Sequence, residues 1–143
     1  MKLYHGSPRK LEGKRLLPRK GRDVFNRPDN LHKAVYATDV KKKAIAMSIL
    51  SCNGVKGGGL DSSKKSATPG IIYKGFPEQE YVFLHTLSSK GFEKVGEGHQ
   101  FISKKPVEPI KTEKLRVSDY LYLIRKASQE EIKKWNEVIK ISS

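Results

Sequence analysis

Short stretches in which apolar and polar residues alternate cover most of this chain, a pattern that favours β-strands over long helices. The first stretch, residues 2–7, ends at Gly6, Ser7 and Pro8 and predicts a short strand. Later stretches are separated by glycine, proline and paired serines, so each predicts one more strand. They cover residues 34–37, 71–73, 80–87, 91–95, 99–103 and 109–117. We expect these strands to form most of a sheet.

Two segments carry helical spacing instead. Residues 40–50 follow a Thr-Asp pair, Thr38-Asp39, that offers an N-cap. A final helix over about 128–140 opens with serine and glutamate at capping-box spacing. Its apolar residues form one stripe, on which Trp135 is expected to be a core anchor.

Two long segments fit neither pattern. Residues 9–33 carry prolines, glycines and many charges, and we expect an irregular connection that borders a functional cleft. Residues 51–70 combine a glycine triplet at 57–59 with serines and lysines, and predict a flexible basic loop. The triplet lacks the Gly-Lys-Ser/Thr ending of a phosphate-binding loop. A turn or short helix is expected over 118–123.

Length and composition place the chain in one class. Its 143 residues fit a single α+β domain spanning 1–143 and rich in short strands. Lys and Arg total 29 against 15 Asp and Glu, and this excess attracts phosphates in nucleic acid, an anionic cofactor or a membrane surface. A lysine-rich surface that keeps the protein soluble explains the charge equally well.

Cysteine usage and the absence of long apolar runs bear on the compartment. Cys52 is the single cysteine, so an internal disulfide and a cysteine metal cluster are excluded. The start of the chain lacks the apolar core of a secretion signal, and no run of about 18 apolar residues occurs. We therefore expect a cytoplasmic protein with no membrane partner.

Two short blocks point to chemistry. Leu3-Tyr4-His5-Gly6-Ser7 ends the first strand, and Val35-Tyr36-Ala37-Thr38-Asp39 forms the second and runs into a lysine-rich helix start. A histidine and a tyrosine so placed can line one cleft, in which the first binds a ribose and the second stacks on a flat ring. Stacking on an aromatic ring contributes about 1–3 kcal/mol by analogy with bases, and a glycine lets a ligand approach the backbone closely.

In these two blocks the sequence resembles the ADP-ribosyltransferase fold, in the branch of diphtheria toxin and the poly(ADP-ribose) polymerases. The resemblance implies two packed, mostly antiparallel sheets with a split between them and flanking helices. It also implies that NAD is the substrate. His5 would bond a ribose hydroxyl, the backbone of Gly6 would hold the nicotinamide carboxamide, and Tyr36 would lie against the nicotinamide ring. Ser7 completes the His-Gly-Ser block.

The following helix would supply the rest of the NAD site. Met47 stands eleven positions after Tyr36, where relatives usually carry a second stacking tyrosine. Ala44 stands where many relatives have a small serine that touches the carboxamide. The polarizable Met47 side chain still offers a wall for an aromatic ring.

The resemblance implies a third catalytic position, which falls in the weakly matching segment 99–107. Relatives carry a glutamate here, before an aromatic or β-branched pair and a Ser-x-x-Pro-Val ending, and it aligns with Gln100. A neutral amide keeps the hydrogen bond but not the charge, and loss of such a contact costs about a hundredfold to a thousandfold in rate. Glu93 and Glu97 lie nearby and replace it if the register differs. The implied catalytic set is His5, Tyr36 and Gln100.

Three functions stay open. The first is a slow or mono-specific ADP-ribosyltransferase that transfers ADP-ribose from NAD to an acidic protein or nucleic acid, which the basic flank over 9–22 would attract. The second is an NAD-dependent RNA 2′-phosphotransferase, a family with His-x-His where this chain has Val35-Tyr36-Ala37. The third is a non-catalytic member of the fold that binds nucleic acid or a protein partner, which Gln100, Met47 and Ala44 favour. His32, His85 and His99 lack metal-ligand spacing, and we expect them to be ordinary histidines without a metal site.

Overall fold

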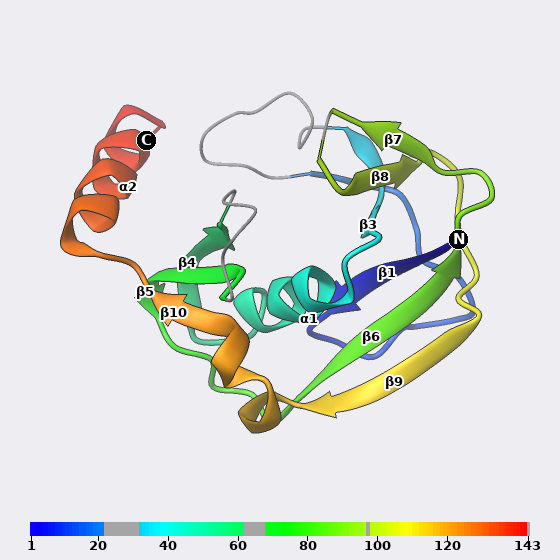
Figure 1. Ribbon diagram of the computed structural model, residues 1–143, viewed down its shortest axis with the longest axis horizontal. Coiled ribbons are helices and arrows are strands. Elements are labelled where there is room, and N and C mark those ends of the chain that lie inside the picture. The colour runs from blue at the N-terminus through cyan, green and yellow to red at the C-terminus, as the bar shows by residue number, and fades with distance from the viewer. Residues whose placement is uncertain (22–31, 62–67, 97, 143) are drawn as a thin grey trace.

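The computed structural model in Figure 1 describes residues 1–21, 32–61, 68–96 and 98–142. In this part of the chain, β-strands predominate and form two sheets with two α-helices, an α+β arrangement. The large sheet contains β1 (Lys2–Ser7), β2 (Arg19–Lys20), β3 (Lys33–Thr38), β6 (Tyr81–Ser88), β7 (Glu93–Val95), β8 (Gln100–Ser103) and β9 (Lys111–Arg116). The small sheet contains β4 (Val55–Leu60), β5 (Gly70–Gly75) and β10 (Ile124–Lys126). The helices are α1 (Lys41–Leu50) and α2 (Gln129–Ser142), and the short 3-10 turns η2 (Val117–Asp119) and η3 (Leu121–Leu123) precede β10.

The strand order of the large sheet is β7-β8-β3-β1-β6-β9, with β2 paired to β3, and every pairing in it is antiparallel. The small sheet has the order β10-β5-β4 and joins β10 to β5 in parallel. The alternating stretches thus predicted most strands to within a few residues. They missed β10, β2 and β4, and the predicted turn or short helix over 118–123 is confirmed by η2 and η3.

α1 lies between the two sheets and holds them apart (Figure 1). It contacts β1, β3 and β6 of the large sheet and β4 and β5 of the small one. Ala46 and Ile49 are fully buried there, and the main core includes Val82, Leu84 and Leu123. Of the two helices that the structure describes, α2 alone flanks the sheets from outside.

The predicted N-cap of the first helix is wrong in detail. Val40 is the N-cap residue, and no side chain caps the helix. Thr38 Oγ1 instead accepts a hydrogen bond from the Val40 N–H at 3.1 Å, which stabilises the turn before the helix. The Asp39 carboxylate instead contacts His99, the residue before β8, at 2.8 Å from its Nδ1.

The predicted flexible loop over 51–70 is wrong for residues 55–60, which form β4, whereas residues 62–67 lie outside the described part. The glycines of β4 allow close packing against neighbouring side chains and do not form a flexible loop. A Cβ on Gly57 would lie 2.3 Å from the Trp135 ring, and one on Gly58 would lie 2.9 Å from Leu50. A strand with side chains at these positions could not fit between α1 and α2.

The second core lies on the face of the large sheet away from α1. Leu3, Leu87 and Phe101 form its centre, and Leu11 and Leu16 attach the segment after β1 to it. Leu16 and Val107 also exchange two backbone hydrogen bonds of 2.7 and 2.9 Å. The predicted irregular connection over 9–33 is therefore partly ordered, while residues 22–31 lie outside the described part.

α2 is attached to the small sheet through Trp135, whose ring stacks on Tyr73 with a centroid distance of 5.6 Å and an interplanar angle of 2°. The predicted capping box is confirmed. The Ser128 N–H donates to Glu131 at 2.9 Å, and the Glu131 N–H donates to Ser128 Oγ at 3.1 Å. Neither helix in the described residues has the length and apolar character that a bilayer crossing requires.

Candidate functional site

The edge of β3 that faces β1 is only partly covered. β1 pairs with it at Tyr4 and Thr38, and β2 pairs with it further along, where Arg19 faces Ala34. Between these two pairings, within the described residues, the imidazole of His5 occupies the edge. Its Nδ1 lies 2.6 Å from the backbone oxygen of Tyr36. We refer to this unpaired stretch between β1 and β3 as the split, and the His5 side chain bridges it.

This hydrogen bond fixes the tautomer of His5. A carbonyl oxygen only accepts, so Nδ1 must carry the hydrogen and Nε2 is left with its lone pair. Burial lowers the pKa of His5, the bond to Tyr36 opposes that effect, and the positive charge of Arg19 lowers it further. A neutral ring with an accepting Nε2 suits a ligand that donates, such as a sugar hydroxyl.

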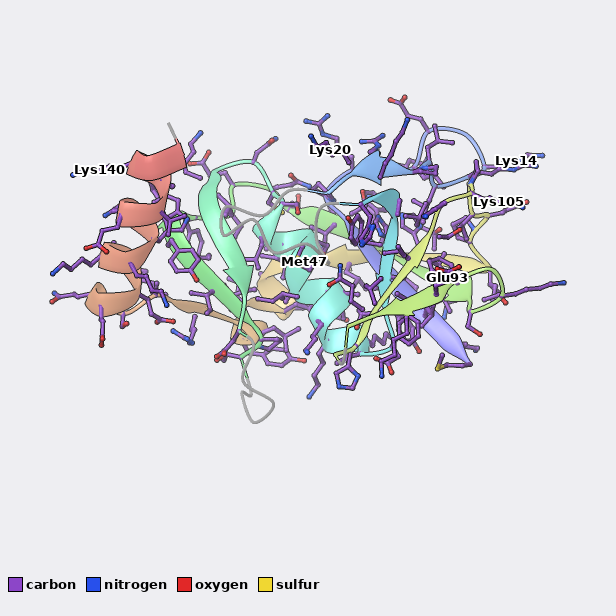
Figure 2. The ribbon with its side chains drawn as sticks, turned by 90° about the horizontal axis from the view of Figure 1, so that it is seen from above. Lys14, Lys20, Met47, Glu93, Lys105 and Lys140 are labelled. Carbon is purple, nitrogen blue, oxygen red and sulfur yellow. The ribbon has the colours of Figure 1, made fainter. Side chains whose placement is uncertain are left out.

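Gly6 is required by the close approach of α1. A Cβ at this position would lie 2.0 Å from the carbonyl oxygen of Ala44 and 2.9 Å from the Cβ of Ser48. Met47 follows Ala44 by three residues, so both lie on one side of the helix. Met47 is 42% exposed and is labelled in Figure 2. The structure therefore brings Gly6, Ala44 and the Met47 side of α1 together.

Strand alternation separates the predicted site residues onto two faces of the large sheet. Tyr4 pairs with Thr38, so these two residues lie on the same face of the sheet. Gly6 is two residues from Tyr4, and Tyr36 is two residues from Thr38, so both lie on that face, which carries α1. His5 belongs to the opposite face, with its ring at the split between the strands. The expected cleft, in which imidazole and phenol face each other directly, is therefore not found: the two rings lie on opposite faces of the large sheet and are joined through the bond from His5 to the Tyr36 carbonyl.

The hydroxyl groups of Tyr36 and Ser7 are both used internally. Tyr36 donates to the His32 carbonyl at 2.6 Å, and burial raises the pKa of Tyr36. Its ring is thereby held in one orientation along β3. The Ser7 hydroxyl donates to the Arg9 carbonyl at 2.9 Å and accepts from the Arg9 N–H, which ends β1 in a turn.

The candidates for the third catalytic position lie on β8 and β7. Gln100 is partly buried and faces Thr38 on the next strand, which places it on the α1 face. Glu93, labelled in Figure 2, is exposed and faces Ile102, which in turn faces Tyr36. Glu93 is thus two strands from Tyr36, or about 10 Å between backbones. Gln100 is the nearer candidate, and Glu97 lies outside the described residues.

His85, which was expected to be an ordinary surface or core histidine, is a core residue next to His5. It faces His5 on the neighbouring strand, and the two rings lie 6.0 Å apart between centroids. His85 is 0% exposed, and its Nδ1 lies 2.8 Å from Thr112 Oγ1, whereas its Nε2 has no hydrogen-bond partner among the described residues. Burial, and then the charge of His5, lowers the pKa of His85 to about 4. A polar residue inside an apolar strand was the only available signal.

Comparison of the chain with protein-family models, curated proteins and solved structures finds no match. Its function must therefore be inferred from its own residues. The described residues place a neutral imidazole with an accepting Nε2 on one face of the large sheet, and a held phenol ring with Gly6 and α1 on the other. The first can accept from a hydroxyl group, and the second can stack on a flat ring.

Proposed function

We propose that this protein has the ADP-ribosyltransferase fold and transfers ADP-ribose from NAD to an acceptor. The observation that carries the proposal is the His5 imidazole, held by Tyr36 in the tautomer that accepts from a hydroxyl. In the proposal this hydroxyl belongs to a ribose of NAD. Two sheets separated by a helix, with the split beside that helix, support the same conclusion.

The nicotinamide would lie on the α1 face of the split. The Ala44 carbonyl and Ser48 fill the space where a Gly6 side chain would be, so in the proposal the carboxamide binds the Gly6 backbone at the edge that faces β3. Tyr36 would cover one side of the ring, and Met47 would offer the opposite wall from α1. Ala44 adds no polar atom beyond its backbone, so the carboxamide would depend on the main chain for its hydrogen bonds.

The reaction breaks the bond between ribose C1′ and the nicotinamide nitrogen. The nitrogen keeps the electron pair and leaves as neutral nicotinamide, while positive charge develops on the ribose. A lone pair of the acceptor then bonds to C1′, and the acceptor loses its proton to water. Gln100 can hydrogen-bond the ribose but cannot balance this charge, so we expect turnover to be about a hundredfold to a thousandfold slower than with a carboxylate.

A second candidate, a non-catalytic protein that binds nucleic acid or a partner through its basic surface, is favoured by the neutral Gln100. In that case the split binds no NAD, or binds it without bond cleavage. NAD binding and NAD turnover must therefore be measured separately.

NAD binding is tested by isothermal titration calorimetry and by protection from thermal unfolding at millimolar NAD. A Met47→Tyr variant restores an aromatic wall at an exposed position and should tighten NAD binding about tenfold, equivalent to roughly 1.4 kcal/mol of stacking. Lys42→Tyr, exposed on another side of the same helix, is the matched control and should bind NAD as the parent does. Absence of heat and of protection in the parent and in Met47→Tyr would remove the proposal.

Turnover is tested by the release of nicotinamide. Gln100→Glu should raise the rate about a hundredfold or more, whereas Glu93→Gln should leave it unchanged. Loss of activity in Glu93→Gln would instead assign the carboxylate to β7. If the parent and both variants bind NAD but release no nicotinamide, the non-catalytic candidate is correct.

A further inference from the structure

Resting on the proposed function, we infer that the acceptor is a nucleic acid, whose phosphate backbone docks on a basic face beside the His5 split. This basic face consists of Lys14, Arg15, Lys20, Lys33 and Lys105, and Arg19 lies next to it on β2. All six side chains are exposed. Figure 2 shows Lys14 and Lys105 at one end of the molecule and Lys20 along the same edge, with Lys140 at the opposite end on α2.

The fold collects these cations from three separate segments. Leu11 and Leu16 attach the segment after β1 to the second core, and the Leu16–Val107 bridge brings it beside the chain that follows β8. Pairing of β2 with β3 then sets Lys20 opposite Lys33. Like charges facing each other are unfavourable within the protein. Such an arrangement becomes favourable when a polyanion neutralises it.

Within the described part of the chain, the cations of the basic face also lack ion-pair partners. None of them forms an ion pair with a described residue, although Glu12 and Glu108 lie in the same segments. Two other arginines in the described residues are paired: Arg116 lies 3.3 Å from Glu80, and Arg125 lies 2.8 Å from Glu131. The basic face therefore keeps its charge available for phosphates outside the protein.

Arg19 connects the basic face to the split. It pairs with Ala34 on β3, the strand to which His5 is bonded, and its positive charge lowers the pKa of His5. A phosphate backbone bound to the basic face would pass beside the position proposed for the ribose. Acceptor atoms of that nucleic acid would then lie near the C1′ carbon that they attack.

The same face is poorly suited to other acidic partners. Protein interfaces depend on buried aromatic and apolar anchors, and Leu17 is the exposed large apolar side chain in the segment from Arg9 to Lys20. Binding to an anionic bilayer through an amphipathic element requires a helix with an apolar face, whereas this segment contains no helix. Charge without apolar anchors is the pattern of phosphate-backbone recognition.

The docking is tested by fluorescence anisotropy with a labelled single-stranded RNA of about 20 nucleotides and the DNA of the same sequence. The variant Lys14→Glu/Lys20→Glu/Lys105→Glu should lose about a hundredfold in affinity, and its slope of log K against log salt should fall by about two. The control, Lys126→Glu/Lys133→Glu/Lys134→Glu, changes exposed lysines of β10 and α2 and lowers the net charge equally. We expect it to lose less than about threefold. Equal losses in both variants would overturn the basic face as a docking site.

Competition and labelling complete the test. Poly-glutamate and vesicles of phosphatidylserine should displace the RNA only weakly; tighter binding of either would overturn the inference. With NAD present, the oligonucleotide should gain the mass of one ADP-ribose, and the basic-face variant should lose this product while still protected by NAD from thermal unfolding. If NAD is consumed but the oligonucleotide is neither bound nor labelled, the acceptor inference fails and the proposed function stands. If RNA binds but NAD does not, the proposed function fails, and the acceptor inference fails with it.

Discussion

α1 and α2 differ in the source of their stability. α1 opens with Lys41-Lys42-Lys43, has no acidic residue in its first turn and has no side-chain cap, so its local electrostatics oppose the helix. α2 opens with a complete capping box, carries Glu130 and Glu131 in its first turn and has Lys140 in its last. α1 is stabilised by burial between the sheets, whereas α2 is stabilised by the capping and charged residues at its ends and by the Trp135 ring that stacks on Tyr73.

The difference bears on the candidate site. Because α1 is fixed by packing on both sides, its Ala44 carbonyl can approach Gly6 closely and keep a constant position beside the split. α2 contacts β5 of the small sheet, and Figure 1 shows it well away from β1, the strand that carries His5. We therefore expect changes in α1 to alter both stability and ligand binding, and changes in α2 to alter stability alone.

The largest expected effect comes from a cavity under α1. Ile49→Ala removes a side chain that is fully buried between the sheets and should lower the free energy of unfolding by about 2–5 kcal/mol. Ile132→Ala, at a half-buried position of α2, should cost about 1 kcal/mol or less. Urea unfolding followed by circular dichroism measures both. Equal losses would show that the two helices are held alike.

The next largest effect is expected on acidification, which should destabilise the large sheet around His85 at a higher pH than the start of α2. The pKa of His85 is lowered to about 4, so below pH 6.5 the unfolded chain binds a proton that the folded chain excludes. Stability should therefore fall as the pH drops from about 6.5 to 4, by roughly 3 kcal/mol at most. The lowered pKa of His5 acts in the same direction. Arg125 and then Ser128 lower the pKa of Glu131 to about 2, so the contacts of Glu131 with these two residues at the start of α2 weaken only below about pH 4.5.

The measurement is urea unfolding at a series of pH values for the parent and for His85→Gln, which removes the titrating ring. The variant should be less stable at pH 7 and should show a flatter dependence between pH 6.5 and 4.5. An unchanged slope would mean that His85 is not the group responsible.

A smaller effect is expected where α2 meets the small sheet. Gly57→Ala places a methyl group 2.3 Å from the Trp135 ring, so the ring must move, at a cost of about 1–3 kcal/mol. Gly59→Ala in the same strand meets its nearest neighbour, Tyr73, at 3.7 Å and is the matched control. Trp135 is the single tryptophan, so its fluorescence reports the displacement directly. Similar spectra for both variants would contradict the proposed close contact.

The parts of the fold that local sequence encodes were predictable. The spacing of Ser128 and Glu131 identified the start of α2, and alternation identified β1, β3 and β6. β4 was missed because its glycines form a strand only under Trp135, which is distant in sequence. β10 was missed because it is three residues long and depends on pairing with β5.

The arrangement of the site was predictable only in part. The two N-terminal blocks led to His5, Gly6 and Tyr36, which lie on adjacent strands, but His5 is on the face of the large sheet opposite to the other two. The pairing of His85 with His5 could not be predicted in this way, because it arises from the register between β1 and β6. The register of two strands so far apart in the sequence depends on their packing, which the local pattern does not specify.

The smallest expected effect concerns the cap of α2 alone. Ser128→Ala removes the acceptor of the Glu131 N–H and should lower the free energy of unfolding by about 1 kcal/mol. Glu131 keeps its contact with Arg125 at 2.8 Å, so the helix should fray without detaching, and the Trp135 fluorescence should stay unchanged. At the other helix, Thr38→Val removes a hydroxyl that does not cap α1 and should cost less than the Ser128 change. A larger loss for Thr38→Val would mean that α1 depends on its N-terminal turn after all.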